Sequence, residues 1–333
     1  LTVADMPACG FSCVVKHIST SACEITDVRC RCTDRDFARS LIPCILAECK
    51  MDEMIALARV EQQMCGLKTE SKSRQTILYS SVGYTIGIVT VILRIWAKVI
   101  TRGFTLDDWI IVGAILLMVL PLACVIKMCT IGFGRHIWNI PDGRTFSYIL
   151  QLFWISGSTY IIVLGAIKIS LCLLYIRIFP GSQRRIVTYT IMAFIIVSDV
   201  ILYFVYLFIC NPVRGYWHID IGAKCLNMNA IGFAVSSFAI VQDVLLLVWP
   251  LICVWNLDLS RQRKFAVGVM IIIGAIGCIT TVLRLHTLVS FHTTLDPTWD
   301  FVSLANWTIF ELLSGIFCAS LPAIRILFSH YLP

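Results

Sequence analysis

The chain has 333 residues, of which 58% are hydrophobic and 14% are charged, and its formal net charge is +7. Ordinary soluble proteins have about 45–50% apolar and about 25% charged residues, so this composition excludes a typical soluble protein and indicates a membrane-embedded body. The basic residues gather at the ends of apolar runs, which is typical of membrane flanks rather than of a nucleic-acid patch, so no nucleic-acid partner is expected.

Eight cysteines crowd the first 65 residues, a density typical of small domains that need disulfides to fold. They are Cys9, Cys13, Cys23, Cys30, Cys32, Cys44, Cys49 and Cys65. Disulfides persist in oxidising compartments, so this end is expected outside the cell or in the secretory lumen. Leu1 opens directly onto polar residues without a signal peptide, so we expect the sequence to be mature or trimmed.

The cysteine spacing resembles that of the fungal CFEM domain. That family has P-x-C-G-x-x-C, a further Cys, an Asp shortly before C-x-C, and three more Cys, and the pattern runs here from Pro7 through Asp27 to Cys65. The resemblance covers about residues 5–67 and implies a small helical basket held by four disulfides. Connectivity stays open, because eight cysteines allow 105 pairings. A zinc site at Cys30 and Cys32 is the weaker alternative, since zinc pairs prefer two to four intervening residues.

In some CFEM proteins the Asp before C-x-C ligates ferric haem, and the resemblance places that role on Asp27. A carboxylate is a hard ligand that favours Fe(III). Six apolar residues could form the floor of a flat site: Val14, Ile18, Val28, Phe37, Leu41 and Ile42. The alternative is that Asp27 caps a helix or loop. Haem is thus the candidate cofactor, and its iron at Asp27 is the leading candidate metal.

Seven apolar runs follow, each long enough for the roughly 20 helical residues that cross a hydrocarbon core of about 30 Å. They lie near residues 76–99, 109–131, 148–178, 186–210, 229–255, 265–291 and 301–328. The sequence therefore predicts an all-α membrane protein. It has a small disulfide-rich helical extracellular domain at 1–67, a linker at 68–75 and a seven-transmembrane helix bundle at 76–330.

The flanking charges favour a plasma-membrane orientation with the N-terminus extracellular and the C-terminus cytoplasmic. Nine basic residues then flank the spans on the inner side and five on the outer side. Lys68, Lys72 and Arg74 precede the first span and nearly cancel this difference. The disulfide-rich domain therefore decides the predicted orientation.

Short motifs along the apolar part resemble the fungal rhodopsin-like seven-span family, which often carries a CFEM domain in front. Among them are Asp107-Asp108-Trp109, Gly132-Phe133-Gly134-Arg135-His136, Cys210-Asn211-Pro212-Val213 and Pro322. The resemblance implies a GPCR-like receptor linked to surface and host sensing. The last run contains no lysine, so a retinal Schiff base is not expected. The D-R-Y and N-P-x-x-Y motifs of animal receptors are absent, so coupling to a heterotrimeric G protein rests on the resemblance alone.

Five charged residues inside the spans are the best pointers to function, since charge in a bilayer is costly. They are Lys168, Asp199, Asp243, Arg284 and Glu311. Counting along alternating helices places Arg284 beside Glu311 in the outer half and Lys168 close in depth to Asp243. We expect both pairs to form, either to fix helix packing or to respond to a ligand.

Two cysteines flank the loop between the fourth and fifth spans, and we expect a disulfide between Cys210 and Cys225. Cys129, at the end of the second span, is the competing partner. The other cysteines of the spans are expected to pack as small apolar residues.

The leading functional interpretation is a cell-surface receptor that senses an unknown extracellular ligand and relays the signal through the bilayer. The alternative is a haem- or iron-capturing membrane protein. A zinc hydrolase is disfavoured, because His286 alone lies within a span and no H-E-x-x-H is present. No nucleotide loop is evident either, so the protein is not expected to be an enzyme.

Overall fold

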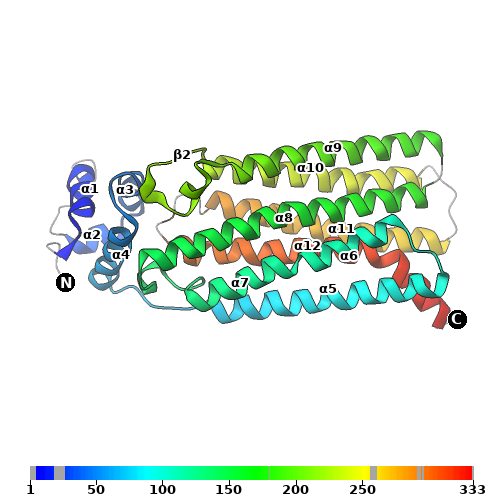
Figure 1. Cartoon of the computed structure of the whole chain (residues 1–333), viewed down its shortest axis with the longest axis horizontal. Coiled ribbons are helices and arrows are strands. Elements are labelled where there is room, and N and C mark those ends of the chain that lie inside the picture. Colours follow the sequence, from blue (N-terminus) through cyan, green and yellow to red (C-terminus); the bar gives the residue numbers. More distant parts are fainter. Residues whose placement is uncertain are drawn as a thin grey trace.

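The computed structural model describes residues 5–18, 27–179, 181–255, 261–290, 294 and 296–331. Long helices run side by side as an elongated bundle, and short helices form a small domain at one end of it (Figure 1). We call the end next to that domain the domain end, and the opposite end the far end. The expected all-α membrane architecture, with a disulfide-rich helical domain before seven candidate spans, is confirmed.

The small domain consists of α1 (Ala8–Ile18), α2 (Val28–Thr33), α3 (Arg35–Glu48) and α4 (Met51–Cys65). Each longer helix buries one apolar face, and they meet over a core that includes Val14, Leu41 and Leu57. The carboxylate of Asp34 begins α3 by accepting hydrogen bonds from its first free backbone N–H groups. Gly66 ends α4 in the left-handed conformation, with a φ of 60°, which glycine adopts without strain.

Disulfides fasten this core, which is too small to be held by apolar burial alone. The bridges with both partners described are Cys9–Cys49, Cys13–Cys44 and Cys32–Cys65. Cys30 is also disulfide-bonded, and Cys23 lies outside the described residues. Loops of this length lose enough chain entropy for each bridge to stabilise the domain by about 3–4 kcal/mol.

The membrane body consists of α5 (Ser73–Thr101), α6 (Leu106–Leu117), α7 (Val119–Ile131), α8 (Gly143–Ile178), α9 (Ser182–Leu207), α10 (Met228–Trp255), α11 (Arg261–Ser290) and α12 (Pro297–Tyr331). α6 and α7 form one span with a break at Met118, because Pro121 has no N–H to donate to the carbonyl of Leu117. With that pair joined, seven spans are long and apolar enough to cross a membrane.

α8 is the central helix of the bundle. In the apolar stretch of 18 residues that qualifies α8 as a span, 61% of the residues are buried. The corresponding share in the peripheral α9 is 11%. α12 packs against α5, α8 and α11. Gly315 lets α12 approach α8 closely, because a Cβ there would lie 2.8 Å from Ile167. Large apolar side chains such as Leu78, Trp96 and Ile201 remain exposed on the outside, as expected of a surface that faces lipid.

A short cap covers the bundle between α9 and α10. It contains β1 (Cys210–Asn211), η3 (Val213–Tyr216), η4 (Ile219–Ile221) and β2 (Lys224–Cys225). The two strands pair antiparallel with Cys210 opposite Cys225, and a disulfide joins these residues across a Cα–Cα distance of 4.0 Å. The bridge expected from the sequence is therefore present, and the competing Cys129 is a free, buried cysteine.

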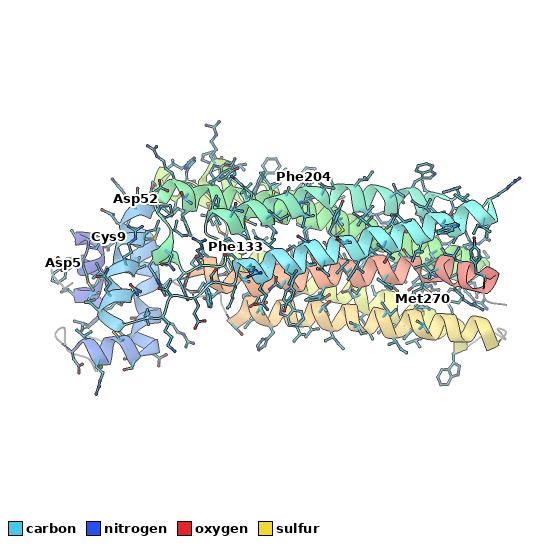
Figure 2. All side chains as sticks on the ribbon, turned by 90° about the horizontal axis from the view of Figure 1, so that it is seen from below. Asp5, Cys9, Asp52, Phe133, Phe204 and Met270 are labelled. Atoms are coloured by element: carbon cyan, nitrogen blue, oxygen red, sulfur yellow. A yellow bond between two sulfur atoms is a disulfide. The ribbon has the colours of Figure 1, made fainter. Side chains whose placement is uncertain are left out.

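The small domain rests on the bundle through α4. Arg59 donates hydrogen bonds to the carbonyls of Trp138, Ile140 and Pro141, which belong to or follow η2 (Ile137–Asn139). The carboxylate of Asp52 accepts from the backbone N–H of Gly143 at 2.6 Å, at the start of α8. These polar contacts hold the domain over the helix ends around Phe133 (Figure 2).

Candidate functional site

A cavity of about 470 Å³ lies inside the domain end of the bundle. Residues from all seven spans line it, and Leu46 of α3 reaches it from the small domain. A second cavity of about 210 Å³ lies between the small domain and the bundle. The two cavities share the lining residues Leu46, Phe153, Tyr216, Met228 and Phe301. The two mainly apolar cavities therefore adjoin, and together they reach from α3 and α4 into the bundle.

Arg284 of α11 lies at the wall of the larger cavity and is 4% exposed. Its Nε lies 3.3 Å from Oε2 of Glu311 on α12, and its guanidinium lies 4.8 Å from the ring centroid of Tyr160 on α8. Glu311 accepts hydrogen bonds from the hydroxyls of Tyr160 at 2.8 Å and Thr281 at 3.1 Å. The pair expected from the sequence is thus brought together between three helices.

The guanidinium of Arg284 is incompletely satisfied. Its Nε and Nη2 are buried and have no hydrogen-bond acceptor among the described residues, although Nε is close to Glu311. A buried donor without an acceptor costs about 1–3 kcal/mol, more where the group is charged. An oxygen acceptor in the cavity would therefore stabilise the cationic guanidinium of Arg284 at the cavity wall.

The polar chain continues from Glu311 toward mid-bundle. The hydroxyl of Thr281 can contact both Glu311 and Asp243, since it lies 2.8 Å from an Asp243 oxygen. Asp243 of α10 forms an ion pair of 2.8 Å with Lys168 of α8. Lys168 also donates to Gln242 Oε1 at 3.0 Å, so the second expected pair is present and is part of a larger network.

Gln242 connects Asp199, the last of the five charged residues singled out in the sequence, to this polar chain. Its side-chain amide donates to Ser198 at 2.9 Å and to Asp199 at 2.8 Å, both on α9. Sequence reasoning did not include Gln242, because an uncharged amide in an apolar run carries no strong signal. All five predicted charges therefore belong to one network of hydrogen bonds and ion pairs across α8, α9, α10, α11 and α12.

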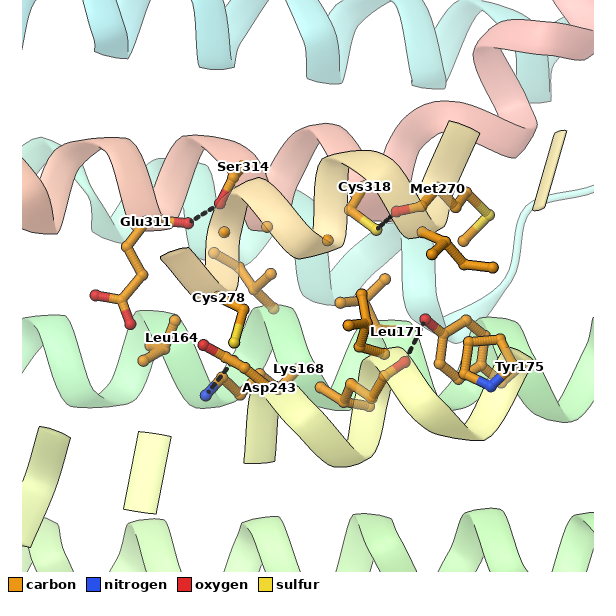
Figure 3. Close-up of a pocket in the computed structure, with 18 residues that line it drawn as sticks. Leu164, Lys168, Leu171, Tyr175, Asp243, Met270, Cys278, Glu311, Ser314 and Cys318 are labelled. Carbon is orange, nitrogen blue, oxygen red and sulfur yellow. Dashed lines mark hydrogen bonds and ion pairs between the residues drawn. The ribbon is translucent and has the colours of Figure 1, made fainter. Parts of the chain in front are cut away.

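Beside this network lies a small cavity of about 60 Å³ (Figure 3). Lys168, Asp243, Glu311 and Ser314 line one part of it, and Tyr175 and Cys318 another. A space of this size with several polar groups has room for a few ordered water molecules. The cavity runs from Glu311 as far as Tyr175 and Cys318, and most of its remaining lining is apolar.

At the far end, Arg94 of α5 forms the centre of a second buried charge cluster. It forms ion pairs with Asp107 at 2.6 Å and Asp108 at 2.8 Å on α6, and it donates to the carbonyl of Ala319 on α12. Lys98 pairs with Asp108 at 3.0 Å, and Arg177 of α8 pairs with Asp107 at 3.1 Å. The cluster therefore fastens four helices together where they end.

This far-end cluster was missed by the analysis of the sequence. In the sequence, Asp107 and Asp108 stand out only as part of a family motif, and Arg94 has no evident partner. The available signal was a single arginine within an apolar run, followed by two adjacent acids after a short turn. Arg94 is 2% exposed, so its partners had to lie within reach.

Asp27 caps a helix, which is the alternative the sequence left open. Its carboxylate accepts from the backbone N–H of Cys30 at 3.0 Å at the start of α2, and the side chain is exposed. Four of the residues expected to form an apolar floor are buried. Val14, Phe37 and Leu41 lie in the domain core, and Ile42 lines the cavity beneath the domain. The haem site stays a prediction.

Two groups of ligand-type atoms in the domain do not make a metal site. Cys9, Cys49 and Glu53 gather closely, as do Cys13, Cys44 and Glu48. Both cysteine pairs are disulfides, so their sulfurs are not thiolates and cannot ligate a cation strongly.

A further buried pair lies between the cavity and the small domain. His136 Nδ1 is 2.5 Å from Oδ2 of Asp296, and the imidazole is stacked between the rings of Trp138 and Trp299. Burial raises the pKa of the Asp296 carboxyl, while hydrogen bonds from His136, the Ile137 N–H and Thr298 oppose that effect. The pair ties the segment before α12 to η2.

Residues 93–330 match the fungal rhodopsin domain, and residues 2–66 match the CFEM domain. The chain therefore belongs to the fungal rhodopsin family and carries a CFEM domain in front of its seven spans. No solved structure matches it.

Curated relatives cover different parts of the chain. A protein named SAT4 family membrane protein, from Emericella nidulans, is 31% identical over 204 residues, which are 60% of this chain and 51% of that protein. Receptor GIN3 from Arthrobotrys oligospora is 22% identical over 242 residues, 72% of this chain and 59% of that protein. A GPI-anchored hemophore from Arthroderma benhamiae is 26% identical over 62 residues, 18% of this chain and 33% of that protein. The chain thus spans little more than half the length of the first two.

Proposed function

We propose that this protein is a receptor of the plasma membrane that binds a ligand at its domain end and relays the event to its far end. The observation that carries the proposal is the position of the cavity. It opens toward the CFEM domain and ends at Arg284, where the buried polar chain begins. A ligand there would contact both the domain and a charge network that extends through the bundle.

The similarity to a protein named as a receptor supports a receptor role over a catalytic one. One relative is named as a receptor, and it matches 72% of this chain. The buried charges of the bundle are paired with one another, an arrangement suited to holding and switching helix positions. We propose no enzymatic activity for this chain.

The orientation we propose has the N-terminus and the CFEM domain outside the cell. Disulfides in the domain and in the cap between α9 and α10 would then all face an oxidising compartment. A glycosylation acceptor placed before Leu1 should be modified in secretory membranes, and one placed after Pro333 should not. The reverse result would contradict the orientation.

The far end would then meet an intracellular transducer, for which we propose a heterotrimeric G protein on the basis of family likeness. Arg177 is half exposed at this end and already pairs with Asp107, so a transducer that binds there could compete for that contact. Rearrangement of a buried ion-pair cluster between two states is a known type of switch.

The experiment compares second-messenger output in cells that express the whole chain. Cells carrying the wild type, Lys168→Met or Glu311→Gln are exposed to surface cues and soluble extracts, with surface expression measured in parallel. We expect a response in the wild type that falls at least several-fold in both variants at matched expression. The lipid-facing Ile201→Ala is the control and should respond like the wild type. Equal responses in all variants would overturn the proposal.

A second candidate function is capture of haem, favoured by the similarity of the CFEM domain to a hemophore and by the exposed Asp27 carboxylate. Titration of the whole chain with ferric haem tests it. The candidate requires tight binding that Asp27→Ala abolishes and that the exposed, neighbouring Asp36→Ala leaves unchanged.

A further inference from the structure

The cavity at the domain end has the chemistry of a site for one kind of molecule. Its walls are aromatic and aliphatic, with Phe153 and Phe301 near the CFEM domain and Leu304 and Ile161 deeper. Among its described lining residues, Arg284 is the only charged one. A volume of about 470 Å³ lies within the usual range for small-molecule sites, roughly 300–1,000 Å³.

Arg284 supplies the polar anchor. Its side chain is 4% exposed, it lines the cavity, and its Nη2 has no acceptor among the described residues. Glu311 approaches the guanidinium through Nε, with 3.3 Å between Nε and Oε2, and Nη2 is left without an acceptor among the described residues. An oxygen that enters the cavity would therefore find a preformed donor at its deep end.

We propose that the cavity binds an acyl compound: an apolar chain that ends in a carbonyl or carboxylate oxygen. The oxygen accepts from Arg284, and the chain runs past Phe153 and Phe301 toward Leu46 of the CFEM domain. This inference rests on the proposed receptor function and names the chemical class of its ligand. Because Glu311 already balances the charge of Arg284, a neutral carbonyl and a carboxylate share this chemistry, and the experiment separates them.

The proposal gives the CFEM domain a direct part in the site. The smaller cavity continues from the shared residues to Ile42, Ile45 and Leu57 of α3 and α4. A longer chain would extend into that space and contact both domains, whereas a short chain would stay within the bundle. Affinity should therefore rise with chain length beyond the gain expected from partition into the bilayer.

The test uses the full chain in phosphatidylcholine nanodiscs and three photoreactive probes of equal length. These are a diazirine-bearing dodecanoic acid, its methyl ester, and the corresponding hydrocarbon without oxygen. We expect saturable labelling by the acid or the ester at peptides of α8 and α12 that line the cavity, and at least tenfold weaker labelling by the hydrocarbon. Preference for the acid over the ester identifies a carboxylate ligand, and equal labelling identifies a neutral carbonyl ligand.

Variants test the anchor and the cavity separately. Arg284→Gln should weaken labelling at least tenfold, and Arg284→Lys should restore part of it. Where Arg284→Gln does not fold, Ala305→Trp fills the cavity without removing the anchor and should have the same effect. Its control is Ile279→Trp, which places the same side chain on the exposed face of α11 and should label like the wild type.

Equal labelling by all three probes, or labelling confined to exposed residues such as Ile279, would show simple partition from the bilayer and overturn the proposal. Absence of labelling by every probe would also overturn it. Neither result touches the proposed receptor function, which depends on second-messenger output in the charge variants and not on acyl probes.

Discussion

Arg284 and Glu311 face each other from neighbouring helices, and each would be costly alone in the bilayer. A charge at mid-membrane costs about 2.5–3.5 kcal/mol on insertion scales, so mutual pairing stabilises both. The hydroxyls of Tyr160 and Thr281 fix the orientation of the carboxylate, which leaves the guanidinium as the adaptable member. A ligand that binds Arg284 would therefore change how strongly Arg284 attracts Glu311.

Neutralising one member of this pair should destabilise the bundle. In Glu311→Gln the buried Arg284 charge loses its counter-ion, and the loss of one partner of a buried pair typically costs about 3–5 kcal/mol. We expect a lower melting temperature for Glu311→Gln in detergent, and partial recovery in the double variant Arg284→Glu, Glu311→Arg. An unchanged melting temperature in the single variant would show that the pair contributes little.

The sequence identified these charges because depth can be counted along helices joined by short loops. Arg284 lies a few helical turns before the end of its span, and Glu311 lies a few turns after the start of the next span. Both residues are therefore at a similar depth, and the pair could be predicted. The unsatisfied atoms of Arg284 were not predictable, since they depend on the angles at which three helices meet. The apolar floor expected for haem stays a prediction, because periodicity alone does not separate a core face from a ligand-binding face.

At the scale of helices, the far-end cluster holds α5, α6, α8 and α12 together. Arg94 reaches two acids in the first turn of α6, where the helix dipole also favours negative charge. The hydroxyl of Ser170 on α8 donates to the carbonyl of Asp107 and adds a further contact. These contacts fix the positions of the four helices relative to one another at this end.

Replacing Arg94 should loosen the far end selectively. Arg94→Ala leaves Asp107 and Asp108 with fewer counter-ions, so the first turn of α6 should open more often. Hydrogen–deuterium exchange should be faster by at least tenfold in α6 but unchanged in α4 of the CFEM domain. Arg102→Ala removes an exposed charge from the same end and is the control. Equal exchange in both variants would contradict the role given to the cluster.

In the molecule as a whole, the CFEM domain and the bundle together line two adjoining, mainly apolar cavities. The domain also contacts the bundle directly, because Arg59 and Asp52 bind it to the backbone around η2 and the start of α8. The sequence predicted both parts and their order from cysteine spacing and apolar runs. It did not predict this interface, since backbone carbonyls at helix ends have no signature in a sequence.

Loss of the docking contact should separate the two parts without unfolding either. Arg59→Ala removes the donor to three carbonyls of the bundle, and it should increase protease cleavage between residues 66 and 73. The control is Arg39→Ala, whose side chain is exposed on α3. Binding of acyl probes that extend into the CFEM domain should weaken in Arg59→Ala, whereas equal cleavage and binding in both variants would contradict the shared site.

The proposed relay requires that a change at the polar chain beside the cavity alters the helices of the far end. Spin labels on Leu106→Cys and Ile186→Cys, both exposed at the far end, report the distance between α6 and α9. The labels are placed in a Cys278→Ser background, because the other described free cysteines are buried. We expect Glu311→Gln to shift the distance distribution measured by pulsed electron paramagnetic resonance in nanodiscs. The charge-swapped pair at 284 and 311 should restore part of the wild-type distribution. Identical distributions in the wild type, the single variant and the swapped pair would contradict it.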